Sequence, residues 1–194
     1  GSGNGIQNSG NGNMTVTGAV MIDKVATGHG IYNAKTVSFG SFSSSDIAKN
    51  GVNNGGSFTV SGNVSVINAV AAGVASNKTF TAGSSTVDTV TAGPGLNNSG
   101  TMTVNGLTSV KNITGSNISA IQNKNTMTLG DVLVDGVNVT VGTDAEGNDM
   151  TNVGNGINNE KNLTVNGTAT ITNVFTDKKG NNIGAGLNVI PGAV

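Results

Sequence analysis

The feature that most constrains the fold of this chain is a short phrase of sequence that returns several times. Residues 52–62 read VNNGGSFTVSG, residues 96–106 read LNNSGTMTVNG and residues 157–167 read INNEKNLTVNG. Each copy follows a Gly and has a leading aliphatic residue, an Asn two positions later and then an apolar–Thr–apolar step. The leading aliphatic residues are Ile6, Ile31, Val52, Val74, Leu96, Ile121, Ile157 and Leu187. Recurrence of one unit at short intervals is the signature of a repeat architecture.

The intervals between the leading residues set the size of the unit. Val52 and Val74 are spaced by 22 residues, and so is the next pair. The longest interval, 36 residues, separates Ile121 from Ile157. We therefore expect about eight coils of about 22 residues, with an insertion at about residues 130–156.

Inside each unit, apolar and polar residues alternate with a period of two. In the copy TMTV, Met102 and Val104 lie on either side of Thr103. This period is typical of a β-strand with one buried face, because successive side chains point to opposite sides of the strand. We expect Met102, Val104 and Leu129 to point into a core, and Thr103 and Thr128 to point outward.

A unit of this size, with three short strands and no helical stretch, cannot bury its apolar face alone. Stacked units bury it, because each strand pairs in parallel with its copy in the next coil, about 4.8 Å along the axis. The sequence therefore predicts an all-β fold, a parallel β-helix (solenoid), as a single domain over residues 1–194. Aromatic residues are 3% of the chain, and we expect Val, Ile, Ala and Met rather than large rings to fill a thin interior.

A column of Asn follows the leading residues at a distance of two positions. Its members are Asn8, Asn33, Asn54, Asn98, Asn123 and Asn159, with Ser76 as the exception. Stacked at one corner, Asn side chains hydrogen-bond the local main chain and the amide of the next coil. The alternative is a glycan-binding row, or glycosylation at Asn13, Asn63, Asn77 and Asn162. We favour the structural ladder, because Asn followed by Thr-rich strands creates such sequons without selection for them.

Charge and composition exclude some classes of partner. The net charge is −1, and all nine basic residues are lysine. Nucleic acid and anionic membranes need a basic surface, so we expect neither as a partner. No apolar run approaches the about 18 residues of a membrane-spanning helix. Few charges, no Cys and abundant Gly, Asn, Thr and Ser suit an exported bacterial surface protein, and the opening Gly-Ser-Gly, typical of a cloning remnant, predicts a fragment of a longer chain.

The Gly–aliphatic–x–Asn units, the TMTVNG-like strands and the Asn column resemble the β-helix passenger domains of secreted bacterial adhesins, of the autotransporter and two-partner-secretion types. The resemblance covers residues 5 to about 190 and lies in the style of the repeat. It implies a right-handed parallel β-helix, secretion or attachment at the bacterial cell surface and outer membrane, and a role in cell adhesion and virulence. The implied partner is a host-cell or sister-cell surface, through a glycan or a matrix protein, with self-association as a further option.

Many β-helices are instead carbohydrate-active enzymes, such as polysaccharide lyases, hydrolases or phage tailspikes. Their chemistry needs carboxylates clustered on one sheet face, whereas the acids here are scattered along the chain. They are Asp23, Asp46, Asp88, Asp131, Asp135, Asp144, Glu146, Asp149, Glu160 and Asp177. The single His, His29, lies in the turn TGHG without a recognisable nucleophile nearby, and we expect it to be a solvated turn residue. We therefore expect no enzymatic activity and no cofactor, and keep the enzyme as the alternative.

Two places offer candidate contacts. Residues 142–149, GTDAEGND, form the most charged window and lie within the longest insertion, so we expect them to project from the rod as a loop tip. The window offers oxygen ligands at nearly alternate positions, as calcium loops do. The candidate calcium ligands are Asp144, Glu146, Asn148 and Asp149. The candidate partner-binding residues are Asp144, Glu146, Asp149 and the single Tyr, Tyr32.

Thr-x-Thr pairs on successive units give a third possible function. Thr79 and Thr81 are followed one unit later by Thr101 and Thr103. Flat arrays of this kind resemble those of ice-binding β-solenoids. The alternative is that Thr is a good strand residue whose copies stack well. Asn and Ser interrupt the array in other units. We therefore rank ice binding third, after the adhesin and the carbohydrate-active enzyme.

Overall fold

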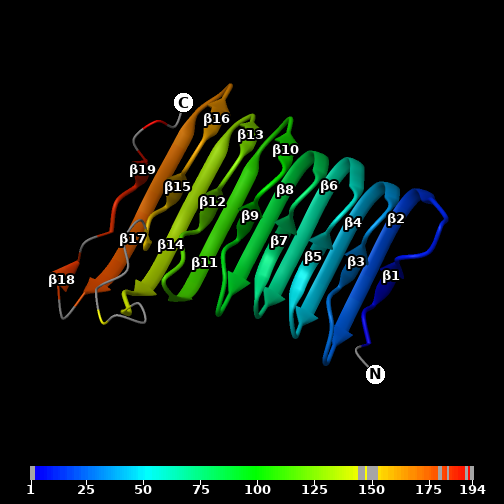
Figure 1. Ribbon diagram of the computed structural model, residues 1–194, viewed down its shortest axis with the longest axis horizontal. Coiled ribbons are helices and arrows are strands. Elements are labelled where there is room, and N and C mark those ends of the chain that lie inside the picture. The colour runs from blue at the N-terminus through cyan, green and yellow to red at the C-terminus, as the bar shows by residue number, and fades with distance from the viewer. Residues whose placement is uncertain are drawn as a thin grey trace.

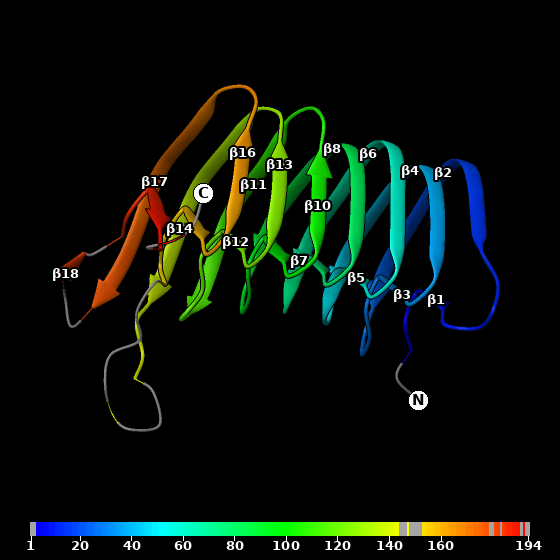
Figure 2. The same cartoon turned by 45° about the horizontal axis from the view of Figure 1, so that its top comes forward.

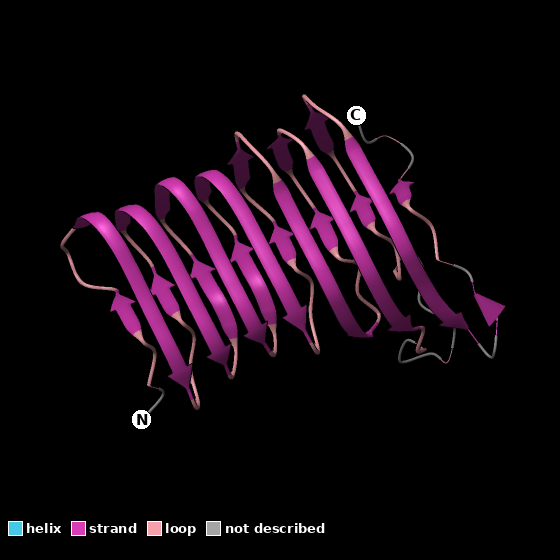
Figure 3. Ribbon diagram, turned by 180° about the vertical axis from the view of Figure 1, so that it is seen from behind, coloured by secondary structure: helices cyan, strands magenta, loops and turns pink. Residues whose placement is uncertain are grey.

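The computed structural model describes residues 3–143, 147, 153–178, 181–182, 184–190 and 192. Within these ranges the chain is all-β and contains no helix, as Figure 3 shows. Its parallel strands are stacked as a β-solenoid of about six turns, with a spacing of about 23 residues (Figure 1). A helix long and apolar enough to cross a membrane does not occur in the described part. The predicted fold class is confirmed.

The first sheet is built from the short strands that carry the leading aliphatic residues. In spatial order they are β1 (Ile6–Asn8), β3 (Ile31–Asn33), β5 (Asn50–Asn54), β7 (Ala72–Ser76), β9 (Leu96–Asn98), β12 (Ile121–Asn123), β15 (Ile157–Asn159) and β19 (Leu187–Val189). All neighbours are parallel, and each leading residue pairs with the next one, from Ile6 with Ile31 to Ile157 with Leu187. The first sheet contains all eight leading residues, and the solenoid has about six turns, fewer than the eight predicted coils.

The second sheet forms the other two sides of each coil. Its strands are β2 (Met14–Val25), β4 (Thr36–Ile47), β6 (Ser57–Ala69), β8 (Thr79–Val90), β10 (Thr101–Val104), β11 (Thr108–Ser116), β13 (Thr126–Leu129), β14 (Val132–Thr140), β16 (Asn162–Val165), β17 (Ala169–Lys178) and β18 (Asn181–Asn182). The long strands β2, β4, β6 and β8 curve over one corner (Figure 2), where their register shifts, between Val16 and Ala19 in β2. In later coils the same corner divides the strand in two, as between β10 and β11.

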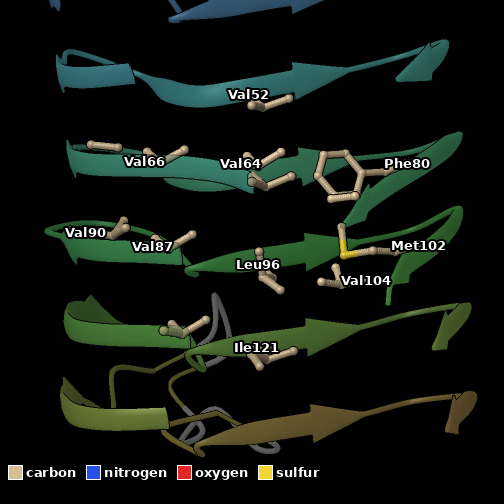
Figure 4. Packing of buried hydrophobic residues seen from close by; sticks show 14 of the residues in the cluster. Val52, Val64, Val66, Phe80, Val87, Val90, Leu96, Met102, Val104 and Ile121 are labelled. Atoms are coloured by element: carbon tan, nitrogen blue, oxygen red, sulfur yellow. The ribbon is translucent and has the colours of Figure 1, made fainter. Parts of the chain in front are cut away.

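The alternating residues of the second sheet point as the sequence predicts. Met102, Val104 and Leu129 are fully buried, whereas Thr103 and Thr128 are partly exposed. Figure 4 shows Val52, Leu96 and Ile121 in one column inside the solenoid, and the register places Val74 between Val52 and Leu96 in this column. The period of two therefore identified the buried face of these strands.

The expectation of an interior without aromatic rings is wrong. Four of the five Phe residues are buried and form a continuous stack through coils two to four. The rings of Phe58 and Phe80 lie parallel, with their centroids 5.5 Å apart, close to the spacing of neighbouring coils. Two small buried residues lie on the same face, Ser44 two positions after Phe42 and Ala82 two positions after Phe80.

Seven of the eight leading aliphatic residues follow a Gly, the exception being Ile121 after Ala120, and a close approach inside the coil explains this Gly. A Cβ atom on Gly51 would lie 2.3 Å from Cγ1 of Val66, and one on Gly73 would lie 2.4 Å from Cγ1 of Val87. Real Cβ atoms do not approach other atoms so closely. A side chain at Gly51 would therefore displace β6, and one at Gly73 would displace β8. The Gly in the repeated phrase therefore serves packing between strands.

The predicted Asn ladder is confirmed. Asn98 is fully buried, and its Nδ2 donates to Oδ1 of Asn123 at 2.8 Å, to the carbonyl of Gly100 at 3.1 Å and to that of Thr126 at 2.7 Å. The Oδ1 of Asn98 accepts from the backbone N–H of Gly100. Each amide thus closes its own turn and joins it to the next coil, and the same pattern runs from Asn8 to Asn54 and from Asn98 to Asn159.

The ladder changes at the one position where the sequence departs from Asn. Asn54 donates to Oγ of Ser76 at 3.0 Å, but Ser76 donates to the carbonyl of Lys78 at 3.3 Å within its own turn. A hydroxyl has a single hydrogen to donate, whereas an amide nitrogen has two. The chain of inter-coil bonds is therefore divided into two segments at the fourth coil.

Candidate functional site

The candidate site is a polar depression on the outer side of the first sheet, near its N-terminal end. It has a volume of about 370 Å³, in the range of about 300–1,000 Å³ typical of small-molecule sites. Its walls come from the first two coils and from the turn that leads into the third. The lining residues are Asn4, Gln7, Ser9, His29, Tyr32 and Lys49.

The register of the first sheet places the centre of this depression. Gln7, Tyr32 and Asn53 each follow a leading aliphatic residue by one position, and they pair directly as neighbours in β1, β3 and β5. Because the leading residue and the ladder Asn on either side point inward, the residue between them points outward. Tyr32 therefore stands on the open face between two amide side chains.

His29 is held in place at the turn that precedes β3. Its backbone N–H donates to Oδ1 of Asn4 at 2.9 Å. Its ring Nδ1 accepts from the backbone N–H of Asn50 at 3.2 Å, and its Nε2 lies 3.1 Å from the side-chain amide of Asn53. The ring is thereby fixed against the third coil, and its centroid lies 6.3 Å from that of Tyr32 with the planes tilted by 32°.

The surroundings of His29 favour its neutral form. Burial lowers the pKa of the imidazole below its ordinary value, and the ammonium of Lys49 lowers it further. Since Nδ1 accepts a backbone hydrogen bond, the ring proton of the neutral form sits on Nε2 and donates. The atom of Asn53 that faces Nε2 is then the amide oxygen, an orientation that follows from the hydrogen bonds.

The structure brings together residues that the sequence left apart. Tyr32 and His29 are both partly exposed, and His29 lies in the predicted turn, where its ring is hydrogen-bonded and stands beside Tyr32. Gln7, Asn53 and Lys49 were not predicted from the sequence as residues of this place. The sequence did contain the information that places Gln7 and Asn53 beside Tyr32. Each of the three residues follows a leading aliphatic residue by one position.

The candidate calcium and partner-binding residues of the insertion lie outside the described residues. They are Asp144, Glu146, Asn148 and Asp149. At the start of the insertion, the N–H of Val141 donates to the carbonyl of Asp177 at 2.9 Å, and that of Gly142 donates to Oδ1 of Asn117 at 2.7 Å. Among the residues that the structure describes, no three potential ligands of the His, Cys, Asp or Glu types gather around one point.

A second corner column, unpredicted by the sequence, organises several of the acids. One residue in each coil of the second sheet has a left-handed backbone, with φ between 52° and 76°. In register these residues are Lys24, Asp46, Asn68, Thr89, Asn112, Gly136 and Asn173. Gly and Asn tolerate this conformation, but Lys and Thr do so only at a cost, so the residue types alone gave no common signal.

The acids beside this column accept hydrogen bonds from the next coil. Asn68 donates to Asp46, Asn112 donates to Asp88 and Asn173 donates to Asp135, each at 2.7 Å. The hydrogen bond from Asn173, with one from Thr172, lowers the pKa of the Asp135 carboxyl below its ordinary value, and the charge of Lys111 also lowers it. The acids therefore join coils at this corner, in the way that the buried amides do at the other.

The Thr columns lie on the outer face of the second sheet, at the start of β8 and along β10 and β13. Thr79, Thr101 and Thr126 pair directly in neighbouring strands, and two residues later Thr81, Thr103 and Thr128 do the same. The second column continues with Thr59 and Thr164 at its two ends. This face is thus a regular array of hydroxyls and methyl groups on a parallel sheet.

Comparison of the chain with protein-family models, with curated proteins and with solved structures finds no match.

Proposed function

We propose that this β-helix is a structural and adhesive region of a secreted or surface-anchored bacterial adhesin, with a non-catalytic role in contact between cells. The observation that carries the proposal is the uninterrupted stack. Leading residues pair from one end of the first sheet to the other, and side chains from Ile31 to Ile157 are buried along its length. Such a stack is a stiff spacer whose length grows with the number of coils.

The two corner columns support the same role. A buried amide ladder and a surface column of carboxylates and amides both connect one coil to the next. Buried polar groups that are fully hydrogen-bonded favour one register over slipped alternatives. A rigid shaft that holds a contact site at a distance from the cell surface needs this fixed register, because slipped coils would bend or shorten it.

Contact with a partner is expected where the regular surface is interrupted. The depression around Tyr32 is one such place, and the insertion at residues 142–149 is the other that the sequence predicts. Irregular features on a rigid scaffold commonly carry recognition. We assign host-cell or sister-cell glycans and matrix proteins as the partners of these places.

The experiment is a binding screen of the purified protein on glycan arrays, on immobilised matrix proteins and on bacterial and epithelial cells. We expect saturable binding to at least one of these surfaces, and loss of that binding after heat denaturation. A control for the depression is Gln122→Ala, which removes a side chain at the same position of the first sheet in a later coil, away from Tyr32. Failure of the folded protein to bind any of these surfaces would contradict the adhesive role.

Ice binding is a second candidate function, favoured by one observation. The Thr columns of β8, β10 and β13 are in direct register, so their hydroxyls repeat at the spacing of neighbouring strands, about 4.8 Å. The test is thermal hysteresis and inhibition of ice recrystallisation, with Thr103→Leu in the middle of the array as the variant. Activity in the parent that this variant lowers would support ice binding, and an inactive parent would exclude it.

A further inference from the structure

We propose that the depression around Tyr32 binds a carboxylated sugar, such as a hexuronate, with Tyr32 packing on the sugar ring and Lys49 pairing with its carboxylate. The inference rests on the adhesive function proposed above and names the class of ligand for one of its contact places.

The walls of the depression suit a single pyranose ring. Its volume of about 370 Å³ is that of a small-molecule site, and its lining is mostly polar side chains that can exchange hydrogen bonds with hydroxyl groups. Asn4 donates to Gln7 at 3.2 Å and Gln7 donates to Ser9 at 3.0 Å. Each of these amides has a second N–H, and each sugar hydroxyl both donates and accepts.

Tyr32 supplies the apolar surface that a sugar also needs. One face of a pyranose ring carries C–H groups, and an aromatic ring with a hydroxyl at its edge is suited to pack on it. His29 is the only ring in contact with Tyr32 among the described residues. The His29 ring is fixed by Asn50 and Asn53, so it holds the Tyr32 ring from one side. The ligand is then restricted to the remaining space beside Tyr32.

Lys49 supplies the preference for an acid. It is exposed and is the only charged residue among those that line the depression. Lys111 is a useful contrast, because it stands in register between Asp88 and Asp135 of the neighbouring coils, so acids surround its charge. An ammonium at the edge of a polar site, without such acids in the lining, favours a ligand with a carboxylate.

The test is isothermal titration of the protein with methyl glucuronide and with methyl glucoside at pH 7 and low salt. We expect the parent to bind the glucuronide at least about tenfold more tightly, and Lys49→Gln to remove that preference. Tyr32→Ala should abolish binding of both sugars. Lys111→Gln is the matched control for Lys49→Gln, and Gln122→Ala changes the residue at the position of Tyr32 in a later coil; both variants should bind as the parent does.

The single His gives an independent readout, since its ring proton signals need no assignment among several residues. Binding of the glucuronide should raise the pKa of His29, because a nearby carboxylate favours the imidazolium. Lys49→Gln should raise the pKa of His29 in the free protein, since it removes a repulsive charge. A His29 titration that neither change affects would contradict the assigned geometry.

The outcomes separate this inference from the proposed function. If the parent adheres to cells but binds neither sugar, or binds both equally, the carboxylated-sugar site is wrong and the adhesive role stands. If the parent binds the glucuronide with the expected preference but adheres to no surface, the site is correct and the adhesive role is wrong.

Discussion

At the scale of single residues, the buried amides decide how the coils stack. Asn98 is enclosed between coils and uses both N–H groups and its oxygen in hydrogen bonds. A smaller or apolar residue would leave carbonyl and N–H groups of two turns without partners. The sequence predicted this column because one residue type recurred at one offset. It did not predict the left-handed column, because Lys24, Thr89 and Asn112 share a backbone conformation but not a chemistry.

We expect Asn98→Ala to lower the free energy of unfolding by about 1–3 kcal/mol, the cost of leaving buried polar groups unpaired. The measurement is urea unfolding followed by far-UV circular dichroism. The matched control is Asn97→Ala, because Asn97 is the neighbouring residue, is partly exposed, and has an Oδ1 that makes no hydrogen bond. Equal losses for the two variants would mean that the ladder has no special role in stability.

The Asp135 carboxyl gives a prediction for pH dependence. Hydrogen bonds from Asn173 and Thr172 lower its pKa in the folded state below the ordinary value. Its contribution to stability is therefore present above the unfolded pKa of about 4, and is lost as the pH falls through the lower folded pKa. We expect Asp135→Asn to destabilise the protein at pH 7 and to have little effect at the acid end.

The check on this prediction is urea unfolding at several pH values between about 2 and 7, together with carboxyl NMR of Asp135. Asn173→Ala removes the largest cause of the shift, so the pKa of Asp135 should move back toward its ordinary value. A pKa that does not change in this variant would show that the hydrogen bond across the corner is not formed in solution.

At the scale of elements, the alternation of the repeated strand fixes which face is buried. The period of two correctly placed Met102 inside and Thr103 outside. A separate expectation, that a thin interior has no room for aromatic rings, was wrong because it considered one coil at a time. The rings of Phe58 and Phe80 stack on each other between neighbouring coils.

Two substitutions on adjacent residues of β10 test this assignment. Met102→Asp should cost several kcal/mol and unfold or fray the central coils, because an unpaired charge is expensive to bury. Thr103→Asp changes the partly exposed neighbour and should cost about 1 kcal/mol or less, as surface substitutions usually do. Circular dichroism and thermal melts of both variants provide the measurement, and similar losses would contradict the assigned faces.

At the scale of the whole molecule, the sequence predicted the stack but not the site that lies across it. All eight leading residues pair as expected, since every copy of the unit follows the same rule. The depression around Tyr32 combines one strand residue from each of two coils with His29 and Lys49, which lie in turns. Turns differ from coil to coil, so the period of the repeat carries no information about which turn residues meet.

The longest insertion provides the last prediction, because the strands before and after it pair directly and the stack continues past it. Ile121 pairs directly with Ile157, and Asn123 hydrogen-bonds to its ladder partner Asn159, although the two residues of each pair are 36 positions apart in the sequence. Val141 and Gly154, on either side of the window, both hydrogen-bond to neighbouring segments. We therefore expect that replacing residues 143–149 with a short Gly-Ser link, while keeping Gly142, leaves the melting temperature nearly unchanged, since loop length affects closure entropy only weakly.

The same replacement should weaken adhesion, most visibly at low salt, where the acids of the insertion attract a basic partner over the longest distance. A variant of full length with Asp144→Asn, Glu146→Gln and Asp149→Asn separates the effect of charge from that of loop length. If this variant adheres as the shortened one does, the carboxylates are the cause. If both adhere like the parent at all salt concentrations, the insertion has no part in contact, and the depression around Tyr32 remains as the contact place to be tested.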